Sequence, residues 1–327
     1  MSTQLVREEI TRFLARPDAE VLCIRGKWGV GKTYAWGKQL EAAQQSKIVK
    51  LARYSYVSLF GVNSLDELKF SIFENVITLS EGVKKADLET LDAFVSKIGS
   101  WRKLTRIAQS VPIVKNFFGA DATALVSFMT IRDQVICIDD IERRGQKLDV
   151  GDVLGLVSYL REQRNCKIIL ILNDERLEGD AKQVFDKNLE KVVDVSLVYE
   201  PTAAESVAVV IAEVDDTSRL IAERCTMLGI TNIRVIKRIR RFVETIKKML
   251  VPTFDDEVFE TAVASIALFS WSHDQPEEAP PLAFLKDKTV DKFGLRSNKD
   301  MSAQQAAWNS LLEAYGYMWT DGFDLGV

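Results

Sequence analysis

Histidine is almost absent from this chain of 327 residues, and cysteine is sparse. A single histidine, His273, cannot build a histidine-rich metal site. The four cysteines are too widely separated for the spacing of zinc ligands: Cys23, Cys137, Cys166 and Cys225. We therefore expect no zinc centre and interpret the cysteines as reduced thiols of the core.

Long apolar runs are missing as well. No stretch approaches the ~20 apolar residues of a membrane-spanning helix, and residues 1–16 mix charged with apolar side chains, unlike a secretion signal. A formal net charge of −4 argues against a generally basic nucleic-acid binder, though not against a local basic patch. Because 47% of the residues are hydrophobic and 28% are charged, we expect a cytoplasmic globular protein with a buried core and no membrane span.

One glycine-rich segment carries the strongest signal. Gly26-Lys27-Trp28-Gly29-Val30-Gly31-Lys32-Thr33 fits the phosphate-loop pattern G-x-x-x-x-G-K-[ST] at every fixed position. It follows the apolar run 21–24, and its backbone N–H groups, with the start of the next helix, would hold an anion. Lys32 would reach the β- and γ-phosphates, and the Thr33 hydroxyl would ligate Mg²⁺. The predicted nucleotide-binding residues are Gly26, Trp28, Gly29, Val30, Gly31, Lys32, Thr33 and Tyr34.

Strands alternate with helices over the first 200 residues. Apolar runs predict strands at 21–25, 54–60, 135–139, 167–172 and 192–198. Helical periodicity predicts helices at 3–17, 32–45, 64–76, 150–163 and 175–190. This alternation is typical of an open, mostly parallel α/β sheet, which binds its ligands at the carboxyl ends of its strands. The phosphate loop, Asp139-Asp140 and Asn173 all fall at such ends.

Pro201 marks a change to helical sequence. Residues 203–250 read as helices with a turn at 228–232, and two more helices are expected near 255–271 and 302–317. We therefore predict three parts. These are a nucleotide-binding core at 1–200 with a helical insertion at about 62–131, a helical lid at 201–252 and a C-terminal helical region at 253–327.

Polar residues at the strand ends are candidates for catalysis. Asp139 is a natural Mg²⁺ carboxylate, and Asp140 occupies the place where many ATPases carry a glutamate that polarises the attacking water. Because aspartate is one methylene shorter, hydrolysis is expected to be slow. Asn173 is a candidate hydrogen-bond donor to that water or to the γ-phosphate. It is also a candidate cap of the helix at 175, and both roles can coexist.

Arginines and basic segments supply further candidates. Arg143, Arg144 and Arg234 are candidate γ-phosphate ligands, the first two in cis or from a neighbouring subunit. The alternative for Arg143 and Arg144 is an internal ion pair or a solvent-facing side chain. Segments 97–115 and 234–248 are candidate nucleic-acid contacts because both are basic, and 97–115 also contains aromatic residues. A helical insertion with inward aromatics and a solvated helix face are the respective alternatives.

Two of these motifs resemble the KAP family of phosphate-loop NTPases, relatives of the AAA+ and STAND ATPases. The resemblance rests on Trp28 within G-x-W-G-x-G-K-T and on Asp139-Asp140-Ile141-Glu142-Arg143. The long insertion between these motifs and the segment 56–61 are also similar to the family, over about residues 3–250. The family implies an ASCE-type sheet, ATP or another NTP bound with Mg²⁺, and self-association. Many members carry membrane helices in the insertion, whereas this sequence has none there.

The resemblance also implies a biological role. Bacterial relatives often occur in anti-phage defence systems, so the family implies a regulatory ATPase switch that controls a separate effector protein. Two alternatives remain open from the residues themselves. One is a nucleotide-stabilised interaction module with little hydrolysis, and the other is a nucleic-acid-stimulated ATPase.

Overall fold

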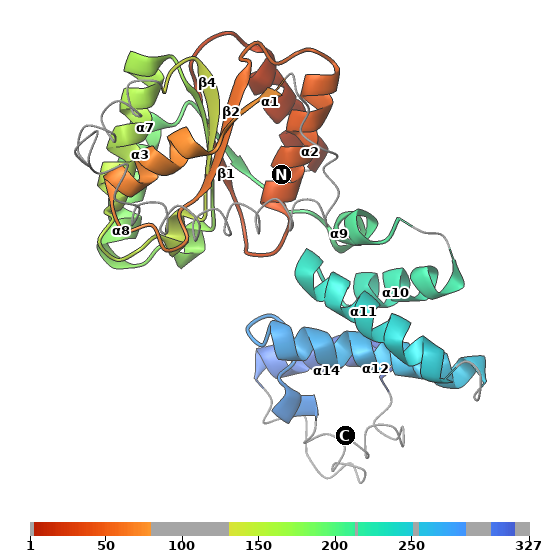
Figure 1. Ribbon diagram of the computed structural model, residues 1–327. Helices are drawn as coiled ribbons and strands as arrows, with labels where there is room; N and C mark the ends of the chain where they lie inside the picture. Colours follow the sequence, from red (N-terminus) through yellow and green to blue (C-terminus); the bar gives the residue numbers. More distant parts are fainter. Residues whose placement is uncertain (1–2, 80–130, 213–214, 251–254, 286–301, 318–327) are drawn as a thin grey trace, which may run out of the picture. The chain divides into compact units, whose positions relative to one another are not determined.

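The computed structural model describes residues 3–79, 131–212, 215–250, 255–285 and 302–317 (Figure 1). By internal contacts the chain divides into unit 1, Met1–Glu200, and unit 2, Pro201–Val327. Unit 1 is built on a six-stranded sheet, whereas the described residues of unit 2 form helices. The predicted fold class, an open and mostly parallel α/β sheet, is confirmed.

The sheet of unit 1 has the strand order β3-β2-β4-β5-β1-β6. Its strands are β1 Val21–Arg25, β2 Arg53–Ser58, β3 Val76–Thr78, β4 Gln134–Asp139, β5 Lys167–Leu172 and β6 Val195–Val198. All neighbours pair in parallel except β3, which runs antiparallel to β2. Because β5 lies between β1 and β4, the carboxyl ends of these three strands adjoin at one edge.

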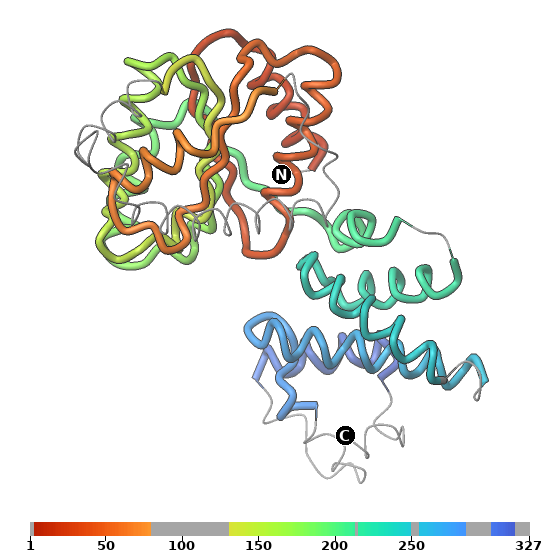
Figure 2. Tube along the Cα trace, viewed as in Figure 1, coloured from red at the N-terminus to blue at the C-terminus, as the bar shows by residue number. Residues whose placement is uncertain are grey.

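Helices cover both faces of this sheet, as the traces in Figures 1 and 2 show. The helices α1 Thr3–Ala15 and α2 Lys32–Gln45 pack on one face, against residues such as Leu22 and Ile24. On the other face, α3 Leu65–Glu74, α7 Val150–Arg164 and α8 Gly179–Val192 pack against residues such as Val21 and Cys23. Successive strand residues point to opposite faces, so two buried cores explain why β4 and β5 are apolar and buried along their whole length.

Local differences from the expected elements are small and have physical causes. The predicted helical insertion at 62–131 contains a strand, β3, because the β-branched residues of 76–78 pair with the edge of β2. Residues 80–130 of this insertion, and with them the basic segment 97–115, lie outside the described residues. The predicted strand 54–60 ends at Ser58, and the helix expected at 175 begins at Gly179, after the short 3₁₀ turn η3 Asp174–Arg176.

Unit 2 consists of packed amphipathic helices in its described part. They are α9 Ala203–Val210, α10 Asp216–Met227, α11 Ile233–Leu250, α12 Asp256–Asp274 and α14 Ala303–Tyr315. In α11 the residues Ile236, Ile239 and Val243 are fully buried, and this helix packs on α9, α10 and α12. None of the described helices combines the length and apolar character needed to cross a membrane.

Candidate nucleotide-binding site

The loop between β1 and α2 has the backbone that only glycine adopts readily. Gly26, Gly29 and Gly31 have φ angles of 152°, 81° and 95°, and α2 begins directly afterwards at Lys32. At Gly26 the packing is also too tight for a side chain, since a Cβ would lie 2.5 Å from the carbonyl oxygen of Tyr199. The positive φ angles of this loop, and at Gly26 the close packing as well, therefore explain the glycines of the sequence motif.

Lys32 is folded back onto the loop that precedes it. Its Nζ donates hydrogen bonds to the carbonyl oxygens of Gly26, at 2.7 Å, and Lys27, at 2.8 Å. The residue is buried, with 8% of its surface exposed. Burial lowers the pKa of Lys32, and this effect is opposed by neighbouring carboxylates, first Asp139 and then Glu142. The ammonium group is thus held at the mouth of the loop among negative charges.

Asp139, the last residue of β4, is the centre of a hydrogen-bond network. Its Oδ2 accepts hydrogen bonds from the Thr33 hydroxyl at 2.6 Å and the Tyr56 hydroxyl at 2.9 Å. Its Oδ1 accepts the backbone N–H of Asp140 at 2.7 Å. Burial, and secondly the charge of Asp140, raises the pKa of Asp139 to about 6. Sequence reasoning missed Tyr56, because its contact depends on the pairing of β2 with β4.

The donor set around Asp139 fits Mg²⁺. Thr33 and Asp139 together offer hard oxygen ligands, and Mg²⁺ commonly takes one or two protein ligands and fills its other positions with water and phosphate oxygens. Among the described residues there is no group of three or more His, Cys, Asp or Glu side chains able to hold a metal ion. A cation held by Thr33 and Asp139 would complete its coordination with water and phosphate oxygens.

Asp140 directly follows Asp139, and its carboxylate contacts Ser58 and Arg143. Its backbone is left-handed, with a φ of 58°, a conformation that aspartate tolerates better than most residues. Its Oδ2 accepts a hydrogen bond from the Ser58 hydroxyl at 2.7 Å, and its Oδ1 lies 3.8 Å from an Arg143 guanidinium nitrogen. Ser58 ends β2, so the Asp140 carboxylate is held on the β2 side of β4.

Arg143 is positioned by aromatic rings as well as by this ion pair. Its guanidinium carbon lies 4.1 Å from the ring centre of Phe60 and 5.4 Å from that of Trp28. Such contacts attract a cation to the face of a ring. The arrangement therefore links the phosphate loop, through Trp28, to the segment that follows β4, and the ion pair weighed for Arg143 from the sequence is present.

Glu142 is a residue of this site that sequence reasoning did not single out. It belongs to the 3₁₀ turn η2 Ile141–Arg143, which packs against β5. Burial raises the pKa of Glu142, and this rise is opposed by nearby backbone N–H groups, first its own and then that of Asn173. Within the described part of the chain, its buried Oε2 has no hydrogen-bond partner. The available signal was the third acidic residue of the motif 139–143, which follows the acidic pair.

The remaining predicted residues divide between the two units. Asn173 is buried and its side chain accepts the Glu175 N–H at 3.2 Å, so it caps the 3₁₀ turn η3 rather than the helix expected at 175. Val30 is buried in the loop, and Tyr34 lies in the first turn of α2 beneath the Lys38 ammonium. Arg234 is an exposed residue of α11 in unit 2, so its role at the nucleotide stays a prediction. The same holds for the nucleic-acid contact predicted for 234–248.

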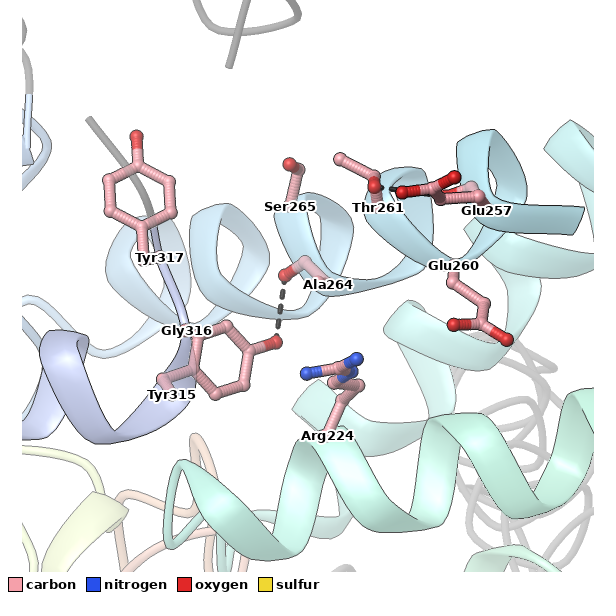
Figure 3. A pocket seen from close by; sticks show the side chains of 9 residues that line it. All are labelled: Arg224, Glu257, Glu260, Thr261, Ala264, Ser265, Tyr315, Gly316 and Tyr317. Atoms are coloured by element: carbon pink, nitrogen blue, oxygen red, sulfur yellow. Dashed lines mark hydrogen bonds between the residues drawn. The ribbon is translucent and has the colours of Figure 1, made fainter. Parts of the chain in front are cut away.

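Unit 2 also contains a small polar cavity of about 130 Å³ (Figure 3). The Tyr315 hydroxyl donates to the Ala264 carbonyl at 2.8 Å, and the Arg224 guanidinium lies 5.7 Å from the Tyr315 ring centre. The lining residues are Arg224, Glu257, Glu260, Thr261, Ala264, Ser265, Tyr315, Gly316 and Tyr317. None of them is a predicted site residue, and we interpret Tyr315 as a side chain that joins α14 to α12.

Comparison with known proteins finds one matching family and several solved structures with a similar fold. Residues 8–250 match the KAP family P-loop domain. Among solved structures, the fold is similar to the Aeropyrum pernix ORC2 protein in its ADP form, with 12% identity, a TM-score of 0.51 and coverage of 96% of this chain and 84% of that one. It is also similar to Cdc6p from Pyrobaculum aerophilum, with 11% identity, a TM-score of 0.44 and coverage of 96% and 79%.

The identities to these structures are low, so the likeness to ORC2 shows the fold alone. Among curated protein sequences, none matches the chain. The family match, in contrast, spans most of the chain and includes the phosphate loop and the acidic motif 139–143. This chain belongs to the KAP family of P-loop NTPases.

Proposed function

We propose that this protein binds ATP with Mg²⁺ at the phosphate loop, hydrolyses it, and uses the difference between the two nucleotide states to control a partner. The observation that carries this proposal is the hydrogen bond between Thr33 and Asp139, 2.6 Å long, beside the buried Lys32. Two separate chain segments, the start of α2 and the end of β4, meet there with the groups that phosphate and Mg²⁺ require. Sequence alone predicted each group, and the shared edge of the sheet brings them together.

Each residue has a definite task in this proposal. Lys32 exchanges its two loop carbonyls for β- and γ-phosphate oxygens, while the loop N–H groups hold the remaining phosphate charge. Bound Mg²⁺ would neutralise phosphate charge between the Thr33 hydroxyl and the Asp139 carboxylate. Tyr56 orients that carboxylate through its hydroxyl. Arg143, held by two rings, is the candidate cation for the γ-phosphate.

The switch follows from differential binding. A conformation that binds ATP more tightly than ADP becomes more populated when ATP is present, and hydrolysis reverses the shift. In this proposal the helical lid at 201–252 responds to the nucleotide, with Arg234 as a γ-phosphate contact, and chains self-associate. The family resemblance supports a regulatory ATPase of a bacterial defence system with a separate effector. The ADP form of the structurally similar ORC2 protein supports nucleotide binding by this type of fold.

A second candidate function is a nucleotide-stabilised interaction module with little hydrolysis. It is favoured by the position of Asp140, whose carboxylate is engaged by Ser58 and Arg143. If Asp140 were the only group able to activate water, a bound ATP would persist. Single-turnover measurements separate the two functions, because the module predicts bound ATP that is not converted to ADP.

Substitution of Lys32 tests the proposal. We expect Lys32→Ala to weaken Mg·ATP binding by about 10- to 100-fold, because each charge-assisted hydrogen bond contributes about 1.5–3 kcal/mol, and to abolish turnover. Isothermal titration calorimetry measures the affinity, and phosphate release across a range of protein concentrations measures turnover per subunit. Lys50→Ala, an exposed lysine outside the site, is the matched control. Unchanged ATP affinity in Lys32→Ala would refute ATP binding at this loop.

A further inference from the structure

The order of the strands decides which carboxylate of the acidic motif faces the phosphate loop. The loop follows β1, and β5 lies between β1 and β4. A side chain that leaves the end of β4 toward β5 therefore approaches the loop. A side chain that leaves toward β2 points instead to the other neighbour of β4.

The side chain of Asp140 points from the end of β4 toward β2. Its left-handed backbone directs the carboxylate to Ser58, the last residue of β2, at 2.7 Å. The second oxygen lies near Arg143, which itself contacts Phe60 in the segment after β2. Both oxygens of this carboxylate are thus engaged on the side of β4 that is remote from β1.

Glu142 belongs to a turn on the β5 side of β4. The turn η2 packs against β5, and the backbone N–H of Asn173, the residue directly after that strand, is among the groups that stabilise the ionised carboxylate. The charge of Glu142 also acts on Lys32 more strongly than that of Asp140 does. One oxygen, Oε2, is buried and without a hydrogen-bond partner in the described residues, so it can accept a proton or a hydrogen bond from a water molecule.

We propose that Glu142, rather than Asp140, is the general base that activates the water attacking ATP. This inference rests on the proposed ATP hydrolysis. As the water oxygen forms its bond to the γ-phosphorus, the bond from that phosphorus to the β,γ-bridging oxygen breaks. Its electron pair leaves with ADP, and one water proton passes to the Glu142 carboxylate and then to solvent. Asp140 instead positions Arg143 through their ion pair.

Glutamine at position 142 tests the assignment, because it preserves size and removes the base. We expect Glu142→Gln to lower the single-turnover rate by about 100-fold or more, with Mg·ATP affinity within about threefold of wild type. Nucleotide recovered from the quenched complex is expected to be ADP for wild type and ATP for the variant. Glu178→Gln, at an exposed site before α8, is the control for loss of a glutamate charge.

Asp140→Asn supplies the comparison. We expect it to slow turnover by less than about tenfold, since it weakens the ion pair with Arg143 and removes a charge beside Asp139, while the amide oxygen can still accept the Ser58 hydrogen bond. A large loss in Asp140→Asn with near-normal hydrolysis in Glu142→Gln would overturn the assignment. So would wild-type protein that binds ATP and never converts it, whereas wild-type protein that binds no ATP refutes the proposed function itself. Thermal melting of each variant shows whether a lost rate reflects misfolding, and Glu142→Asp, which keeps a carboxylate, is then expected to recover part of the rate.

Discussion

Replacing Asp139 by asparagine is expected to stabilise the nucleotide-free protein and weaken its binding of Mg·ATP. The carboxylate is buried, and its pKa of about 6 lies above the value of about 3.9 in an unfolded chain. Because the folded pKa is the higher one, the folded state loses stability as pH rises from about 4 to about 6. The full loss persists above pH 6. The folded protein without nucleotide therefore disfavours the ionised form of Asp139, the form proposed to bind Mg²⁺.

The magnitude follows from these pKa values. A tenfold difference in proton affinity corresponds to about 1.4 kcal/mol, so the ionised carboxylate costs about 3 kcal/mol at pH 8. Asparagine retains much of the network, because its oxygen can face the Asp140 N–H while its NH₂ faces the hydroxyls of Thr33 and Tyr56, which also accept hydrogen bonds. We expect a gain of about 2–3 kcal/mol, which raises the Tm of a domain of this size by about 5–10 °C.

Differential scanning calorimetry at several pH values provides the assay. In wild type, the transition that moves upward with Mg·ATP identifies the nucleotide-binding unit. At pH 8 the corresponding transition of Asp139→Asn is expected to lie higher without nucleotide and to move less when Mg·ATP is added. As pH falls to about 4 the gap in unfolding free energy should shrink below about 1 kcal/mol, since the wild-type carboxyl is then protonated. A variant less stable than wild type at pH 8, or a gap independent of pH, would refute this reasoning.

Two further substitutions test the loop and its arginine. Gly26→Ala is expected to destabilise the fold by at least about 1–3 kcal/mol in urea denaturation, since φ is 152° and the new Cβ would meet the Tyr199 carbonyl. Gly155→Ala in α7 is the control, because a Cβ at Gly155 would have no atom within 4 Å. This variant should be as stable as wild type or more stable. Arg143→Ala is expected to slow hydrolysis, and mixing it with Lys32→Ala chains should not restore the rate, because the guanidinium is held by rings of its own chain. Recovery in the mixture would instead place this arginine in a neighbouring subunit's site.

Local patterns predicted the sheet and the residues at its edge. The phosphate loop, the apolar strand ending at Asp139 and the strand ending at Asn173 are each recognisable within about ten residues. Their meeting at one edge follows from the general rule for parallel strands. The strand β3 was missed because three residues are too few for a periodic signal, and its place depends on an exposed edge of β2. Tyr56 was not predicted as a site residue, because the sequence of a strand does not show which side chain its hydroxyl will contact once the strands pair.

The acidic motif 139–143 is the clearest example of a site whose geometry could not be predicted from the sequence. Spacing along the chain ranked Asp140 first, since it directly follows Asp139. The structure adds two facts that no local pattern contains, the strand order and the backbone conformation. The left-handed φ of Asp140 directs its carboxylate to β2, and the next turn carries Glu142 over the end of β5. Because β5 separates β4 from the loop strand β1, the carboxylate two positions later in the motif lies toward the strand next to β1. A glutamate there also has the longer side chain, so the short reach expected of Asp140 does not by itself require slow hydrolysis.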